Sequence, residues 1–266
     1  TDELNSFYVL NKFLSSNNNT LVVASSIYQA NMFYDKLNNY TDKVILFPMD
    51  DFITSVAVAM SPELKLKRLE TIKKIKNNEK LIIVTNLMGY LRYLTDIDQI
   101  DKLNLYLKKG STINRDELVK TLNDYGYTRE SLVLNTGNYA VRGYIMDIFP
   151  IEEEHPIRIE LFGDNIESIR FFDESSQLSI NEVDEINILP IKEIDTEVKS
   201  SIYDYLKNPD TYFLDEKQIL DEYNKICDDI KTYNEENNID KKHMFELNDI
   251  NPSNIIYLNH LETSNH

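Results

Sequence analysis

Residues 139–150 read YAVRGYIMDIFP, and residues 157–164 read IRIELFGD. Aliphatic and other side chains alternate in the second stretch, which is typical of a β-strand with one buried face. The inward face would carry Ile157, Ile159 and Leu161, and the outward face Arg158, Glu160 and Phe162. Arginine and aromatic residues are enriched in protein-binding hot spots, although an ordinary solvated face often carries them too. The stretch predicts an antiparallel sheet with a candidate binding face.

The neighbouring residues extend this sheet in both directions. The predicted strands are Leu132–Leu134 and Tyr139–Phe149, joined by a turn at 135–138, then Ile157–Phe162, Ile166–Phe172 and Glu185–Leu189. A helix precedes them, because Asn114 can cap its first turn, Glu117 stands in capping-box position and Gly126 can end it. We therefore expect residues 105–195 to form an α+β domain on a curved antiparallel sheet.

In the residues before this domain, the apolar side chains recur with a different spacing. Apolar runs alternate with helix-period segments, the pattern of βαβ units and a parallel sheet. The predicted strands are Thr20–Ala24, Val44–Phe47 and Leu81–Val84. A clear helix start follows the second strand, with Ser61 as N-cap and Pro62 as the first helical residue. Residues 1–104 are thus expected to be half of a doubly wound α/β domain.

The residues after the central domain return to helical spacing. Strands are predicted at Thr211–Leu214 and Ile255–Leu258, and the polar run Tyr233–Lys242 is expected to be a solvated connection. The apolar stripe of the helices must be covered by another part of the chain. We expect residues 196–266 to pack back on the first domain, so that the central domain is an insertion tethered at both ends.

Composition restricts the classes of function. The formal net charge is -17 and the pI is near 4.7, the opposite of what phosphate neutralisation requires, so nucleic acid is not expected as a direct ligand. No stretch reaches the roughly 20 apolar residues of a membrane span, and residues 1–16 lack signal-peptide features. A cytoplasmic protein without a membrane partner follows. The four histidines are scattered and the single cysteine is Cys227, so no metal site is predicted.

Nucleotide binding by an α/β domain needs a glycine-rich loop at a helix N-terminus. The six glycines show neither a P-loop nor a GxGxxG motif: Gly89, Gly110, Gly126, Gly137, Gly143 and Gly163. Asp215 and Glu216 follow an apolar strand and imitate the acidic end of a Walker B strand. Without a phosphate loop, a strand end and helix cap at Asp215 is the favoured interpretation. No catalytic residue and no cofactor are expected in this chain.

The quoted stretches resemble a known family. Residues 139–150, 158–164, 168–173 and 186–190 are similar to domain 2 of the bacterial transcription-repair coupling factors and of UvrB, with the signature Arg-Gly-(x)3-Asp-x-Phe-Pro intact. Upstream, residues 47–48, 61–63, 68–69 and 83–85 resemble the flanking α/β domain of the coupling factors rather than that of UvrB. The similarity covers roughly residues 20 to 195, is specific in the central part and fades after Ser200.

The resemblance implies a UvrA-binding central domain with Arg142, Arg158 and Phe162 as contact residues. All three are expected to face outward, so that their replacement by Ala would leave folding nearly untouched. It also implies that residues 1–104 and 196–266 form a helicase-like scaffold with a degenerate ATP site. The chain would then be a non-catalytic adaptor that recruits UvrA to stalled transcription complexes in nucleotide-excision repair. ATP, magnesium, RNA polymerase and DNA would be bound by other domains of a longer parent protein.

Two alternatives stay open at this point. The chain could belong to a UvrB-type or helicase-type ATP-dependent repair enzyme whose P-loop precedes Thr1, which a nucleotide-binding assay on a longer chain would detect. It could also be a structural interaction domain for a partner other than UvrA. A pull-down with UvrA separates that alternative from the adaptor.

Overall fold

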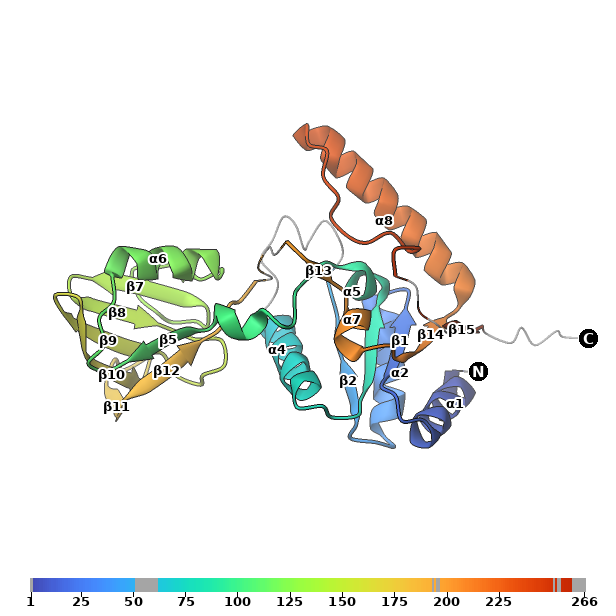
Figure 1. Ribbon diagram of the computed structural model, residues 1–266, viewed down its shortest axis with the longest axis horizontal. Helices are drawn as coiled ribbons and strands as arrows, with labels where there is room; N and C mark the ends of the chain where they lie inside the picture. Colours follow the sequence, from blue (N-terminus) through green and yellow to red (C-terminus); the bar gives the residue numbers. More distant parts are fainter. Residues whose placement is uncertain are drawn as a thin grey trace, which may run out of the picture. The chain divides into compact units, whose positions relative to one another are not determined.

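The computed structural model describes residues 2–50, 62–192, 194, 197–250, 252 and 255–259. The chain divides into two compact units, which we name the α/β unit (Thr1–Leu94 with Lys199–His266) and the inserted unit (Thr95–Val198) (Figure 1). The sequence placed the first boundary at 104, ten residues later, because the turns and the 3-10 helix η1 (Ile100–Leu103) before β5 carry no periodic pattern. Residues 195 and 196, the second expected boundary, lie outside the described residues.

The α/β unit is built on one parallel sheet. Its five strands lie in the order β15-β14-β1-β3-β2, with bounds Ile255–Leu258, Asp210–Leu214, Thr20–Ala24, Ile82–Asn86 and Val44–Leu46. All four pairings are parallel, and Leu21 faces Thr211 across the β1–β14 pair. Every residue of β1 and β3 is buried, as expected for strands covered on both faces. The residues after Ser200 thus contribute two strands to the same sheet as the first ninety residues.

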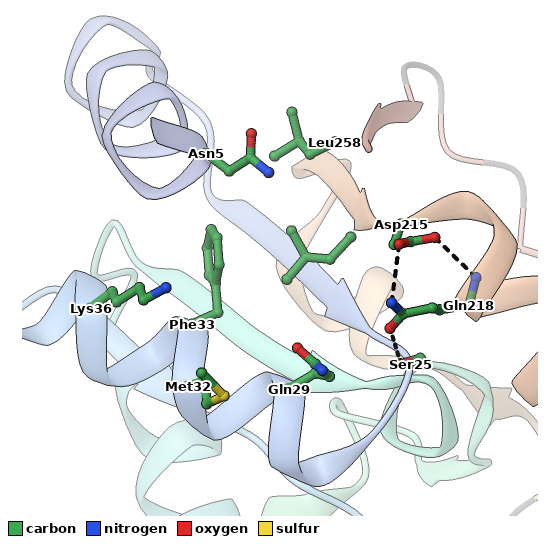
Figure 2. A pocket seen from close by; sticks show the side chains of 10 residues that line it. Asn5, Ser25, Gln29, Met32, Phe33, Lys36, Asp215, Gln218 and Leu258 are labelled. Atoms are coloured by element: carbon green, nitrogen blue, oxygen red, sulfur yellow. Dashed lines mark hydrogen bonds between the residues drawn. The ribbon is translucent and has the colours of Figure 1, made fainter. Parts of the chain in front are cut away.

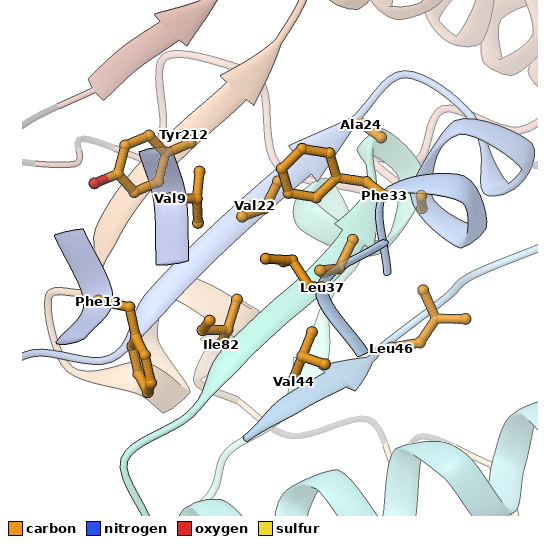
Figure 3. Packing of buried hydrophobic residues seen from close by; sticks show 12 residues of the cluster. Val9, Phe13, Val22, Ala24, Phe33, Leu37, Val44, Leu46, Ile82 and Tyr212 are labelled. Carbon is orange, nitrogen blue, oxygen red and sulfur yellow. The ribbon is translucent and has the colours of Figure 1, made fainter. Parts of the chain in front are cut away.

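Six helices of the described residues belong to this unit. They are α1 (Asp2–Ser15), α2 (Ile27–Asn38), α4 (Pro62–Lys76), α5 (Leu87–Leu91), α7 (Ile202–Leu206) and α8 (Glu216–Asn237). In one core cluster, Phe13 of α1 and Phe33 of α2 pack with strand residues such as Val22 (Figure 3). Ser26 caps α2 by accepting a hydrogen bond from the Gln29 amide at 3.2 Å. Ser61, the predicted cap of α4, lies outside the described residues.

The predicted solvated connection at Tyr233–Lys242 is wrong in its first half. Helix α8 continues to Asn237 and ends where Asn238 adopts a left-handed φ of 50°. Polar residues on an exposed helix face have no apolar period, so composition alone could not separate them from a loop. None of the described helices combines the length and the apolar character needed to cross a bilayer.

The inserted unit contains a six-stranded sheet in the order β11-β10-β9-β8-β7-β6. The strands span Ser179–Val183, Asn165–Phe172, Ile157–Phe162, Ile145–Ile148, Asn138–Arg142 and Thr128–Arg129. All pairings are antiparallel except β6 with β7. A separate antiparallel pair joins β5 (Leu105–Lys108) to β12 (Glu185–Ile188). The inserted unit also contains α6 (Arg115–Asp124). Two short strands, β4 (Leu94–Thr95) and β13 (Lys199–Ser200), pair with one another where the chain passes between the two units.

The strands and the turn of the first predicted hairpin are wrong: the hairpin is formed by β7 and β8. Residues 139–149 do not form one long strand, because the chain turns at Gly143 and Tyr144 and Arg142 pairs with Ile145. Gly143 has a φ of 61°, which glycine adopts without the penalty that a Cβ would bring. Leu132–Leu134 is not a strand; its Val133 packs against Ala140 and Phe149 in a small buried cluster. The fold class itself, a parallel α/β domain with an inserted α+β domain, is confirmed.

The predicted alternation in β9 is confirmed. Ile157, Ile159 and Leu161 are buried, whereas Phe162 is exposed. The predicted helix cap is also present, because the Asn114 side chain accepts from the Asp116 and Glu117 amides at 2.9 and 3.0 Å. The side chains of β9 thus alternate between the buried core side of the sheet and its outer face.

Candidate protein-binding surface

A buried carboxylate lies at the centre of the outer sheet face. Asp147 of β8 is 1% exposed and stands opposite Arg158 of β9 and Ala140 of β7. Arg158 donates from Nε to Asp147 Oδ1 at 2.8 Å and from Nη2 to Oδ2 at 3.0 Å. Arg142 Nη2 also donates to Oδ2. The structure therefore brings two of the three predicted contact residues together on one carboxylate.

Arg158 is fixed on several sides. Its guanidinium lies over the Phe172 ring, 4.3 Å from the centroid, and its Nη2 donates to Gln177 Oε1 at 2.8 Å. Hydrogen bonding to Asp147 raises the pKa of Arg158 above its ordinary value, so the group stays charged. Its side chain is only 15% exposed. Arg158 lies on the outer face of the sheet as predicted, but it is one half of a largely buried ion pair, so we expect its replacement to cost more stability than that of an ordinary surface residue.

Arg142 and Phe162 are more accessible. The Arg142 side chain is 45% exposed, and Phe162 is 73% exposed at the end of β9. Phe162 lies on the same sheet face as Arg158, four residues further along the strand. It lines a shallow hollow with Tyr144, which is 70% exposed in the β7–β8 turn, and with Glu167. The surface thus combines a cationic part with an exposed aromatic part.

Several residues of this surface were missed from the sequence: Asp147, Phe172, Gln177 and Tyr144. Asp147 had a visible signal, because it is the lone charged residue in the apolar run YIMDIF. A carboxylate there must find a partner if the strand is buried. Gln177 gave no such signal, because it reaches Arg158 from the turn between β10 and β11.

The α/β unit has a crevice where its parallel strands end (Figure 2). Ser25 follows β1, Asp215 follows β14, and Leu258 belongs to β15. Ligands of open α/β sheets bind at this edge. Here Gln218 of α8 reaches across the edge: its Nε2 donates to Asp215 Oδ2 at 3.0 Å, and Ser25 Oγ donates to its Oε1 at 3.4 Å. The crevice is therefore crossed by the protein's own side chains.

Asp215 is a helix cap. The Gln218 amide donates to Asp215 Oδ1 at 3.1 Å, so both carboxylate oxygens accept bonds from Gln218. Its φ of 59° places it in the left-handed region that L-residues adopt at a cost. The favoured interpretation of the Asp215–Glu216 pair, a strand end followed by a cap, is confirmed.

One group among the described residues has ligand atoms close enough for a metal ion. His155, Asp173 and Glu174 offer three such atoms within 4.8 Å of one another, and His155 Nδ1 lies 3.3 Å from Glu174 Oε2. Asp173 already accepts from the Ser175 and Ser176 amides, which lowers its pKa below the usual value. His155 belongs to the β8–β9 connection and Asp173 and Glu174 to the β10–β11 connection, so the group lies beside Gln177 rather than at Asp147.

The comparisons with known proteins match this architecture. The family model described as the UvrB interaction domain matches residues 105–194, close to the bounds of the inserted unit. The transcription-repair-coupling factor of Bacillus subtilis (strain 168) is 33% identical over 181 residues, 67% of this chain and 15% of that protein. The protein of the same name from Staphylococcus aureus (strain USA300) is 32% identical over 203 residues, 75% of this chain and 17% of that protein. The matched region is thus a small part of these relatives.

Proposed function

Because the chain is a UvrB-like module of the transcription-repair-coupling factor family, we propose that it is a non-catalytic adaptor whose inserted unit binds UvrA. The adaptor would recruit UvrA to stalled transcription complexes in the cytoplasm. RNA polymerase, DNA, ATP and magnesium would be bound by other domains of a longer parent protein. The net charge of -17 supports the assignment of DNA contacts to those other domains.

The observation that carries this proposal is the outer face of the β7–β8–β9 sheet. It presents the half-exposed Arg142 and the exposed Phe162, with Arg158 held beneath by Asp147. Guanidinium forks pair bidentately with carboxylates, and aromatic rings fill apolar recesses of a partner. The three residues that the resemblance assigned to UvrA binding thus lie on one sheet face in a unit that matches an interaction domain.

Calorimetric titration of purified UvrA into the chain tests the proposal. We expect saturable binding, and we expect Phe162→Ala to weaken it by about 30-fold to 1,000-fold, the usual cost of removing a hot-spot side chain. Because Phe162 is largely exposed, its replacement should change the free energy of unfolding by no more than about 0.5 kcal/mol.

The matched control is Tyr106→Ala, which removes another exposed aromatic side chain, on β5 in the smaller sheet of the same unit. It should leave UvrA affinity unchanged. No heat of binding with the unaltered chain would contradict the proposed function. Equal losses for Phe162→Ala and Tyr106→Ala would contradict the location of the surface.

A further inference from the structure

Asp147 is an unusual residue for its position. A carboxylate that lies within a strand and is 1% exposed loses its hydration, which is unfavourable unless charged partners replace the water. Its neighbour on β7 is the small Ala140, which leaves the space above the carboxylate to the side chain of Arg142, two residues further along the same strand. Two guanidinium groups thus surround one carboxylate, and the cluster carries a net positive charge within an acidic chain.

The two arginines of this cluster differ in what they leave available. Arg158 uses Nε and Nη2 on Asp147 and Gln177, and one face of its guanidinium covers Phe172. Arg142 donates to Asp147 through Nη2, and its side chain is three times as exposed, 45% against 15%. Only Arg142 can therefore turn most of its remaining N–H groups toward an approaching protein.

We propose that Asp147 is the positioning residue of the binding surface and that it gives the two arginines different tasks. Arg158 holds the carboxylate in place. Arg142, oriented by that carboxylate, pairs with an acidic side chain of the partner. The inference rests on the proposed function, because the partner is taken to be UvrA. It goes beyond the resemblance, which gave Asp147 no role in binding and gave Arg142 and Arg158 the same role.

The test is a double-mutant cycle read by calorimetric titration of UvrA into the full chain. Asp147→Asn keeps the shape but removes the charge that orients Arg142, and we expect about a tenfold or greater loss of affinity. In an Arg142→Ala background the same change should cost almost nothing, because the side chain that it orients is already gone. Equal losses from Asp147→Asn in both backgrounds would overturn the proposal, since a merely structural role does not depend on Arg142. Asp124→Asn, at an exposed position of α6, is the matched control for removing one carboxylate.

A second comparison decides the matter even if Asp147→Asn does not fold. Arg142→Ala should weaken UvrA binding by about tenfold or more and lower the melting temperature less than Arg158→Ala does, because Arg158 still holds Asp147 through two hydrogen bonds. Arg158→Ala should lower the melting temperature by several degrees, because it removes two of the bonds that satisfy a buried carboxylate. The reverse pattern, with binding lost only through Arg158 and stability lost only through Arg142, would overturn the division of tasks. Absent binding by the unaltered chain would instead refute the proposed function on which the division rests.

Discussion

At the scale of single residues, neighbouring positions of strand β9 carry either a buried aliphatic side chain or a charged side chain of the outer face. Ile159 is fully buried beneath the sheet, whereas Arg158 and Glu160 lie on its other side. The alternation of IRIELF predicted this separation, because side chains in a strand point to opposite faces in turn. It could not predict how deeply Arg158 lies. That depth depends on Phe172 and Gln177, which reach it from another strand and a turn.

Ile159→Ala should therefore destabilise the inserted unit. Removing a fully buried isoleucine leaves a cavity, and we expect the free energy of unfolding to fall by about 2 to 5 kcal/mol in a denaturant titration. Glu167→Ala, an exposed change on the neighbouring strand β10, is the control and should cost less than about 0.5 kcal/mol. Equal stability of the two variants would mean that the core does not lie on the Ile159 side of the sheet.

At the scale of elements, local sequence signals located most helices and strands but not every boundary. The cap at Asn114 could be predicted because a short polar side chain directly before a helical pattern of apolar residues commonly caps the first turn. The β7–β8 turn could not, because Arg-Gly-Tyr lacks the Asn-Gly or Asp-Gly signal and apolar residues continue on both sides. The neighbouring relation of Arg142, Asp147 and Arg158 depends on that turn and its register. This is why the centre of the candidate surface was missed.

Helix α8 provides a prediction at this scale. Asp215 caps the helix with Oδ1 and holds Gln218 with Oδ2, so Asp215→Ala should lower the free energy of unfolding by about 0.5 to 2 kcal/mol. Asp215→Asn is the control, because asparagine caps comparably and tolerates a left-handed φ. A malachite-green phosphate assay should give no ATP turnover for either variant or for the unaltered chain. ATP turnover abolished by Asp215→Ala would show instead that this carboxylate serves a magnesium site.

At the scale of the whole molecule, the order of strands along the chain differs from their order in the sheet. Strand β14 comes from the last quarter of the sequence, yet it pairs with β1 inside the sheet of the α/β unit. Helical periodicity after Ser200 predicted amphipathic elements that must pack on another part of the chain, but a periodic pattern does not show which part. The pairing of β14 with β1 shows that it is the parallel sheet. The inserted unit therefore lies, in the sequence, between strands of one sheet.

This arrangement predicts which parts of the chain fold alone. Residues 1–94 joined to residues 199–266 by a short Gly/Ser linker should fold, because all five strands of the parallel sheet are present. Leu94 and Lys199, the residues to be joined, belong to the short strands β4 and β13, which pair with one another, so the linker need span only a few residues. Residues 95–198 should fold separately as a second domain with its own core.

Circular dichroism and thermal unfolding of three purified fragments check this prediction. The joined α/β unit and the isolated inserted unit should each unfold cooperatively, and only the inserted unit should retain UvrA binding in calorimetry. Residues 1–94 alone should not unfold cooperatively, because removal of β14 exposes the edge of β1 and the apolar side chains that Tyr212 and Phe213 cover. A cooperative transition for residues 1–94 as steep as that of the joined unit would show that the segment after Ser200 is dispensable to the first core. The parallel pairing of β1 with β14 would then contribute little to its stability.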